Sequence, residues 1–393
     1  MHDVPQRRLS RWWLGAGIVL VAANLRPAVV AVSPVLEQVR AAESLSATAA
    51  GVLTALPVFC FGAFAPLAPR LSLRIGAERT LIAALGVLLL GFGLRLVPGL
   101  VPLFLGTVVC GSAIAVGNVL LPALIKRDFA DRAGLMTGLY TMAISAGGAL
   151  AAGLTVPIAE AAGFDWRGAV GMWVVFAAIP ALVWAPRAFG PQVRTAGARM
   201  PGGLWRVPLA WQVTGFMCLQ SLTYYASLSW LPAIFAGRGT DPTSAGLLLA
   251  LASACGIVSS LVTPMLATRT RTQRVPVIAA TAVTVLGVLG VLALPGAELP
   301  SMILMGIGQG SSLSLALTVI VLRAPDGLRA SQLSGMAQSV GYCLAALGPF
   351  LFGALHDLSG GWTVPLLALL VVFAPQLLCG LLAARDRLVG PPL

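Results

Sequence analysis

The chain has 393 residues, of which 58% are hydrophobic and only 10% are charged, and its formal net charge is +12. Soluble domains average about 25% charged residues, so this composition excludes an ordinary globular protein and indicates a polytopic membrane protein. The basic residues are spread over short segments between apolar runs rather than gathered in one patch, so we expect no nucleic-acid partner.

Twelve apolar segments follow one another, each of roughly the 20 residues that a helix needs to cross a bilayer. The first six are centred near Asn24, Pro57, Val87, Ala113, Ala146 and Phe176, and the last six near Leu222, Cys255, Leu286, Ser311, Ala345 and Leu370. A stretch rich in Arg, Gly and Pro separates the two sets. We therefore expect an all-α polytopic membrane protein with an N-terminal six-helix half at 1–186, a cytoplasmic linker at 187–206 and a C-terminal six-helix half at 207–393.

The basic residues between the apolar segments predict the orientation of the chain. If the N-terminus is cytoplasmic, the inside segments hold 20 Lys or Arg residues, and the outside loops hold only Arg40, Arg167 and Arg238. An excess of Lys and Arg in cytoplasmic loops is the normal pattern of membrane proteins. We expect a multi-pass protein of the cell inner membrane with both termini in the cytoplasm.

Arg26 lies in the middle of the first apolar segment, two residues after Asn24 and directly before Pro27. An arginine near the bilayer centre costs at least about 2.5–3.5 kcal/mol, so it is retained where it faces a protein interior or a wet cavity. We therefore interpret Arg26 as part of a solute-binding site. A purely structural role is the alternative, because Pro27 lacks an N–H and frees a backbone carbonyl that Arg26 would cap. Arg95, near the outer end of the third segment, is expected to extend to the membrane interface.

Two short matches indicate that the halves repeat. The segment Arg132–Gly138 aligns with Arg329–Gly335 at an offset of 197 residues, and Pro34 aligns with Pro232 at an offset of 198. Transporters built from two parallel six-helix repeats bind their solute near the bilayer midplane, between the repeats. We expect two pseudo-symmetric six-helix halves with a site between them.

The residues that most enzymes and metal sites need are scarce within the apolar segments. The histidines are His2 and His356, the six cysteines lie in apolar runs without disulfide or zinc spacing, and no G-x-x-x-x-G-K-[ST] motif occurs. All thirteen acidic residues fall in loops, in tails or at span ends. We therefore expect no enzyme, no metal site and no cofactor, but a secondary transporter whose positive cavity favours an anion or a strongly dipolar solute.

Three segments, Asn24–Pro27, Ser46–Arg70 and Gly117–Phe129, resemble the cyanate porter (CynX/NimT-like) family of the major facilitator superfamily, which includes nitroimidazole exporters. The resemblance covers essentially the whole N-terminal half, and the C-terminal half fits by topology. It implies the twelve-helix fold of that superfamily and transport by alternating access. The loop from Arg70 to Arg79 is similar to the superfamily's signature but lacks its usual Asp, so the conformational lock assigned to that Asp is not carried over.

The resemblance also implies which spans line the central cavity: spans 1, 4, 7 and 10, helped by 2, 5, 8 and 11. The polar and aromatic residues at compatible depth are Asn24, Arg26, Asn118, Tyr140, Gln220, Tyr224, Tyr225, Gln309, Ser311, Ser312, Gln338 and Tyr342. For the candidates other than Arg26, the alternative to solute binding is a structural role, either in helix packing or in a hydrogen bond to a neighbouring helix backbone. At the offset of 198 residues, Tyr224 stands where Arg26 stands in the first half.

Three functions remain open. The first is a secondary active or facilitative transporter that moves a small anionic or polar solute by alternating access, with its central site around Arg26. The second is an exporter of nitroimidazole-like or other neutral drug-like compounds. The third is a membrane sensor that does not transport. The expected partners are a small-molecule solute and membrane lipid, and we expect a monomer.

Overall fold

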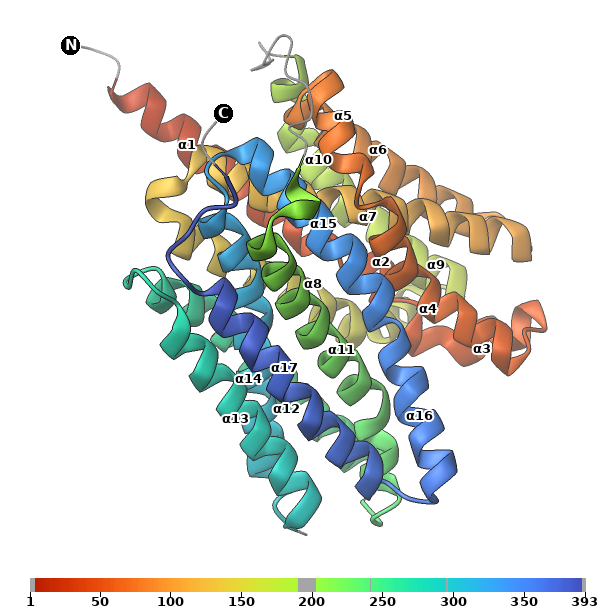
Figure 1. The fold of residues 1–393 in the computed structure, drawn as a ribbon. Helices are drawn as coiled ribbons and strands as arrows, with labels where there is room; N and C mark the ends of the chain where they lie inside the picture. The colour runs from red at the N-terminus through yellow and green to blue at the C-terminus, as the bar shows by residue number, and fades with distance from the viewer. Residues whose placement is uncertain (1–3, 190–202, 241, 295, 391–393) are drawn as a thin grey trace.

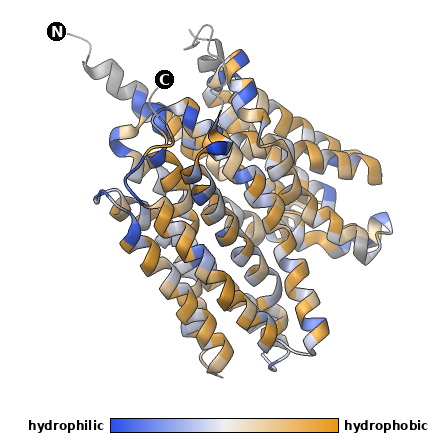
Figure 2. Cartoon of the chain, in the orientation of Figure 1, coloured by the Kyte–Doolittle hydropathy of each residue, from blue (hydrophilic) through white to orange (hydrophobic). Residues whose placement is uncertain are grey.

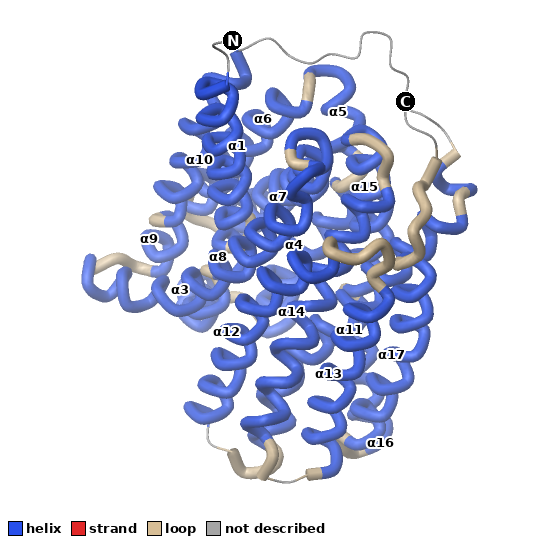
Figure 3. Tube along the Cα trace, turned by 90° about the vertical axis from the view of Figure 1, so that its left-hand side faces the viewer, coloured by secondary structure: helices blue, strands red, loops and turns tan. Residues whose placement is uncertain are grey.

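The computed structural model describes residues 4–189, 203–240, 242–294 and 296–390, and every regular element in these ranges is helical (Figures 1 and 3). The first half contains α1 (Val4–Asn24), α2 (Pro27–Val30), η1 (Ser33–Val35), α3 (Leu36–Glu43), α4 (Ala47–Phe64), α5 (Leu67–Ile75), α6 (Ala77–Leu96), α7 (Leu100–Asp128), η2 (Ala130–Arg132), α8 (Ala133–Ala162), α9 (Trp166–Gly171) and α10 (Trp173–Phe189). The second half contains η3 (Leu204–Arg206), α11 (Pro208–Ala236), α12 (Pro242–Ala267), α13 (Arg274–Ala293), α14 (Glu298–Arg323), α15 (Gly327–Ala345), α16 (Leu347–Ser359) and α17 (Thr363–Ala383). The all-helical class predicted from the sequence is confirmed.

Ten helices in the described ranges are long and apolar enough to cross a membrane, or eleven if the bent pair α4 and α5 forms one span. The twelfth expected segment is α11, a helix of 29 residues that includes Gln212 and Gln220. It is long enough to span, at 1.5 Å rise per residue, but more polar than the others. Apolar residues dominate the long helices along most of their length, and hydrophilic residues gather toward their ends (Figure 2).

Most of the predicted linker, residues 190–202, lies outside the described residues. The last helix of the first half, α10, reaches Phe189, and α11 begins at Pro208. Helix α10 thus extends three residues into the predicted linker and η3 lies inside its other end, and the linker boundaries stay a prediction.

Proline breaks several spans and so shapes the interior. Pro27 occupies the first turn of α2, directly after the break at Leu25 and Arg26 that ends α1. A proline fits there because a first-turn residue has no helical partner for its N–H. The pair α4 and α5 bends by 53° at the break next to Pro66. The first break is the one that matters for function, because it places Arg26 between two helix ends.

The two halves pack against each other at the end of the bundle where α1 and α8 begin and α17 finishes, and they diverge toward the other end (Figures 1 and 3). Thr141 of α8 donates a 2.9 Å hydrogen bond to the carbonyl of Ser260 on α12. Gly138 lets the helix backbones approach, since a β-carbon there would lie 2.5 Å from the carbonyl oxygen of Leu261. We call this end the closed end.

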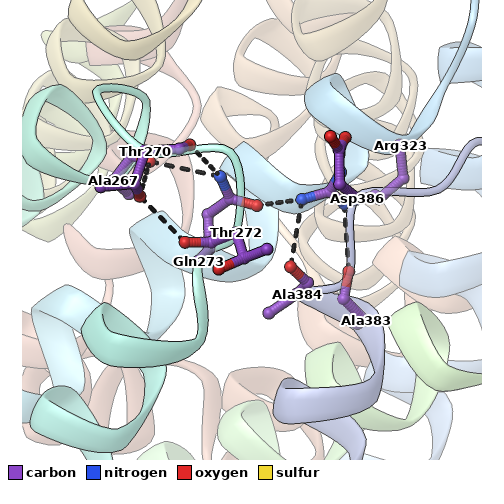
Figure 4. Close-up of polar contacts among 8 residues, drawn as sticks. All are labelled: Ala267, Thr270, Thr272, Gln273, Arg323, Ala383, Ala384 and Asp386. Atoms are coloured by element: carbon purple, nitrogen blue, oxygen red, sulfur yellow. Dashed lines mark hydrogen bonds and ion pairs between the residues drawn. The ribbon is translucent and has the colours of Figure 1, made fainter.

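A buried arginine organises the second half at the closed end (Figure 4). Arg323, the last residue of α14, is 2% exposed. It donates to the carbonyls of Ala383 (3.1 Å) and Ala384 (3.4 Å), to the side-chain oxygen of Gln273, and to Asp386 at 3.4 Å. It thereby joins the end of α14 to the residue before α13 and to the end of α17. In the first half, a similar tie joins α7 to α6, where Arg127 contacts Glu78 at 2.6 Å.

Replacing Arg323 with methionine is expected to lower the free energy of unfolding by about 1–3 kcal/mol, because the Gln273 oxygen and two carbonyls lose a charged donor. A thermal melt of the purified protein in detergent measures the change. Arg387→Gln serves as the control, since Arg387 is exposed at the same end. Equal melting temperatures for Arg323→Met and the wild type would show that the cluster contributes no net stability.

Candidate functional site

Arg26 lies in the break between α1 and α2, where its side chain is half-buried. On the facing helix α8, Gly148 leaves room for the arginine stem, because a β-carbon there would lie 3.4 Å from Cβ of Arg26. Its Nη1 donates to the hydroxyl of Tyr225 at 3.5 Å, its only hydrogen bond to the described residues. This distance is at the long limit for a hydrogen bond, and a guanidinium carries five donors. Arg26 therefore keeps most of its donor capacity for another partner.

A cavity of about 250 Å³ lies beside Arg26, between the two halves. The first half contributes residues of α2, α8 and the α1–α2 break, and the second half contributes residues of α11, α12 and α14. The lining residues are Arg26, Val30, Ile144, Ser145, Gly148, Ala149, Ala152, Tyr224, Leu228, Leu231, Leu249, Ala252, Ser253, Gly256, Met302, Met305, Gly306, Gln309, Gly310 and Leu313. No acidic residue lines the cavity in the part of the chain that the structure describes, so its one charge is positive.

Two consecutive tyrosines of α11 face Arg26 from the second half. Tyr224 lines the cavity, and Tyr225 contacts the guanidinium. Their rings pack edge to face with centroids 5.3 Å apart, which fixes both rings relative to each other. The alignment of Tyr224 with Arg26 in the sequence repeat thus corresponds to two side chains that line the same cavity.

Gln309 of α14 is the third predicted site residue that lines this cavity, after Arg26 and Tyr224. Its Nε2 atom is buried and has no hydrogen-bond partner among the described residues. A buried amide without a partner is unusual, because leaving such a group unpaired costs about 1–3 kcal/mol. The hydroxyl of Ser312 is also buried and unpaired among the described residues, but Ser312 does not line the cavity.

Several other predicted site residues lie away from the cavity and bond to helix backbone. Asn24 donates to the carbonyl of Leu20 in its own helix at 2.9 Å. Gln220 donates to the carbonyl of Met217 at 3.2 Å and to the hydroxyl of Ser221 at 2.6 Å. These contacts satisfy the polar groups locally, as polar residues in membrane helices commonly do.

Five more candidates form contacts between helices. The backbone carbonyl of Asn118 accepts from Gln338 at 3.0 Å, across the two halves, and from Tyr140 at 3.5 Å. Tyr342 packs edge to face on Phe61 with ring centroids 5.6 Å apart. The remaining candidate, Ser311, shares a 2.9 Å hydrogen bond with Thr263 of α12. In this conformation these residues hold helices together, Asn118 through its backbone carbonyl, and none of them lines the cavity.

The prediction that Arg95 extends to the membrane interface is wrong. Arg95 is 2% exposed, and its Nη1 donates to the carbonyl of Ala28 in α2. Its stem packs on α7, where a β-carbon at Gly106 would lie 2.8 Å from Cγ of Arg95. Arg26 is therefore not the only positive charge inside the bundle. Arg95 binds a carbonyl of α2, which is the structural role considered for Arg26.

The cavity also contains residues that sequence reasoning missed. Ser145 of α8 and Ser253 of α12 line it, and so do Met302 and Met305 of α14. Nothing in the sequence separates these residues from ordinary core residues, because serine is common at helix contacts in membranes and methionine commonly fills gaps in cores. The sequence repeat offered no signal for them either.

A family model described as Major Facilitator Superfamily matches residues 12–349 of the chain. The chain is 40% identical to the uncharacterized transporter YycB of Bacillus subtilis (strain 168), covering 99% of this chain and 98% of that protein. It is 39% identical to the 2-nitroimidazole transporter of Escherichia coli (strain K12), over 96% of this chain and 97% of that protein. It is 27% identical to the cyanate transport protein CynX of the same strain, over 88% of this chain and 90% of that protein.

Solved structures agree on the fold. The proton:xylose symporter XylE superimposes with a TM-score of 0.75 at 15% identity, covering 96% of this chain and 97% of that chain. The transporter FucP in an outward conformation superimposes with a TM-score of 0.74 at 12% identity, covering 95% of this chain and 99% of that chain.

Proposed function

Because this chain belongs to the major facilitator superfamily, in its cyanate porter-like branch, and is a multi-pass secondary transporter rather than an enzyme, we propose that it carries a small anionic or polar solute through the cavity beside Arg26. One observation carries the proposal. Arg26 has unused donors in a cavity that both halves line and that contains no acidic side chain of the described residues.

The chemistry of the cavity supports a solute with one charged or strongly dipolar end. A guanidinium presents a planar fork of donors that matches two oxygens of a carboxylate-like group. The hydroxyl of Tyr225 and the unpaired amide of Gln309 supply further donors from the second half. The apolar side chains of Met302, Met305 and Leu313 line the same cavity and suit the uncharged part of a solute.

The position of the cavity between the halves suits alternating access. Arg26 belongs to the first half and Tyr225 to the second, so a solute held by both would connect them. In this structure the halves are packed together at the closed end, as the contact from Thr141 to Ser260 illustrates. Rocking of one half against the other would expose the cavity to the opposite side of the membrane. Because none of the described residues that line the cavity is acidic, we propose uniport, anion exchange or co-transport of a protonatable solute.

A nitro-aromatic solute is the second candidate. It is favoured by the 39% identity to the 2-nitroimidazole transporter, whose coverage is almost complete. A nitro group has two coplanar oxygens, as a carboxylate does, so Arg26 would bind either one with the same fork of donors. The identity to CynX, and a 45% identical match over 82 residues to the putative anionic 4-hydroxy-benzoate permease of Thauera aromatica, favour an anion.

Flux into proteoliposomes tests the proposal. Purified protein is reconstituted and offered radiolabelled cyanate, small aromatic carboxylates and 2-nitroimidazole in separate experiments. We expect saturable flux of at least one of them and its loss in Arg26→Ala. Saturable flux that persists in Arg26→Ala would contradict the Arg26 site. No flux of any compound, in protein that is folded and correctly inserted, would favour the sensor alternative.

We propose that the protein lies in the cell inner membrane as a monomer, with both termini in the cytoplasm. The support is the excess of basic residues at one end of the spans. Reporter fusions after Arg199 and after Asp241, two positions outside the described residues, should be cytoplasmic and periplasmic respectively. A reversed result at either position would contradict this orientation.

A further inference from the structure

A groove of about 730 Å³ runs along the outside of the bundle between α1 and α8. Its walls are apolar and include Ala16 and Leu20 of α1 and Leu135 and Leu139 of α8. It shares no residue with the cavity beside Arg26. It is therefore a separate feature, and Trp12 and Ala16 in its wall are exposed at the surface of the bundle.

The groove extends from the closed end into the membrane-spanning part of both helices. Arg11 lines one end, and Leu20 lies nine residues further along α1. Nine residues of helix rise about 14 Å, which is close to half the hydrocarbon thickness of a bilayer. Trp12 and Trp13, next to Arg11, are 68% and 65% exposed. Tryptophan is enriched at the level of lipid headgroups, so these residues place the Arg11 end of the groove at that level.

That end of the groove carries a surplus of positive charge. Arg11 and Arg132 both line it, and they share a single exposed carboxylate, Asp131, at 2.5 Å and 3.9 Å. Arg11 also donates to the backbone carbonyl of Asp128 at 3.0 Å. A neighbouring pocket of about 330 Å³ adds Arg269 from the second half and is also lined by Arg132 and Asp131. Arg269 forms no ion pair with any described residue. Three arginines therefore surround one carboxylate.

We propose that this groove binds an anionic phospholipid, with an acyl chain between α1 and α8 and the headgroup phosphate beside Arg132. The apolar length of the groove suits a lipid chain, and the basic end suits an anionic headgroup rather than a zwitterionic one. Arg269 lies across the junction from Arg132, because α8 packs on α12 at the closed end. A headgroup that contacts both arginines touches both halves, so its binding favours the conformation that is closed at this end.

Native mass spectrometry of the delipidated full-length protein tests the site. Dioleoyl phosphatidylglycerol and dioleoyl phosphatidylcholine have the same chains and differ in headgroup charge. We expect phosphatidylglycerol to bind at least roughly tenfold more tightly, since each basic residue near a charged lipid contributes roughly fivefold. Arg132→Gln should reduce that affinity about fivefold. Arg271→Gln, which removes the same charge from an exposed loop residue at the same end, should leave it unchanged.

A second variant tests the acyl-chain part of the groove. Ala16 is exposed in the groove, so Ala16→Phe fills it without displacing a buried side chain. It should weaken binding of both lipids, whereas Ala83→Phe, an exposed position on α6, should weaken neither. Inorganic phosphate alone should not compete at the same concentration. Equal affinities for the two lipids, competition by phosphate alone, or a protein dimer in place of bound lipid would each overturn the proposal.

Discussion

Arg26→Lys is expected to weaken solute binding by roughly 10- to 150-fold while the protein stays folded, and Arg26→Ala should abolish nearly all binding. A charge-assisted hydrogen bond contributes about 1.5–3 kcal/mol, which corresponds to that range of affinity. Lysine keeps the charge but presents a compact ammonium instead of a planar fork, so it loses the bidentate contact. Solute affinity and melting temperature are measured on the same preparation in detergent.

The two quantities separate a binding role from a structural one. Arg387→Lys is the matched control, because it makes the same exchange at an exposed residue far from the cavity. If Arg26 only stabilised the break before Pro27, its substitution would lower the melting temperature and leave the affinity of the folded fraction unchanged. That result would remove the anion site and leave the fold intact. Arg95 already binds the carbonyl of Ala28 next to this break. We therefore expect the Arg26 substitutions to reduce solute affinity rather than stability.

Arg95→Ala should lower the free energy of unfolding by about 2–5 kcal/mol, as truncation of a large buried side chain does. Two losses combine, because the side chain fills space between α6 and α7 and its guanidinium binds Ala28. Arg95→Met keeps most of the volume and removes only the donor, so its effect should be smaller. Thermal melts of both variants, with solute affinity measured alongside, make the comparison.

The position of Ala28 adds a consequence for binding. Ala28 follows Arg26 by two residues, so a shift of α2 would also move the guanidinium. Arg95→Ala should therefore weaken solute binding even though Arg95 does not line the cavity. Wild-type stability in both variants would contradict the role of Arg95 described above.

The helical class followed from physical rules that act on the sequence directly. Long apolar segments must form helices in lipid, because every backbone group has to be paired within the segment. The more polar span α11 was predicted in the same way, as the apolar segment centred near Leu222. Arg26 was recognised because a charge at the bilayer centre needs a specific environment.

The sequence was least informative about which way a side chain points. Arg95 lies near the end of an apolar segment, and depth alone cannot tell a lipid-facing arginine from one that packs on Gly106. Asn24 and Gln220 were candidates for the same reason, yet each bonds to a carbonyl of its own helix. Met302 and Met305 line the cavity, but in the sequence they look the same as residues of a packed core.

The glycines at the closed end make the energy difference between conformations sensitive to single methyl groups. At Gly134 a β-carbon would lie 2.7 Å from the carbonyl oxygen of Pro264, and at Gly138 it would lie 2.5 Å from that of Leu261. Alanine at either position would force α8 away from α12 and disfavour closure. When only part of a protein population is competent to bind, the observed affinity falls by that fraction. Alanine at Gly134 or Gly138, more than 100 residues from Arg26 in the sequence, would thus alter the apparent affinity, and a screen for affinity changes would recover such variants alongside true contact residues.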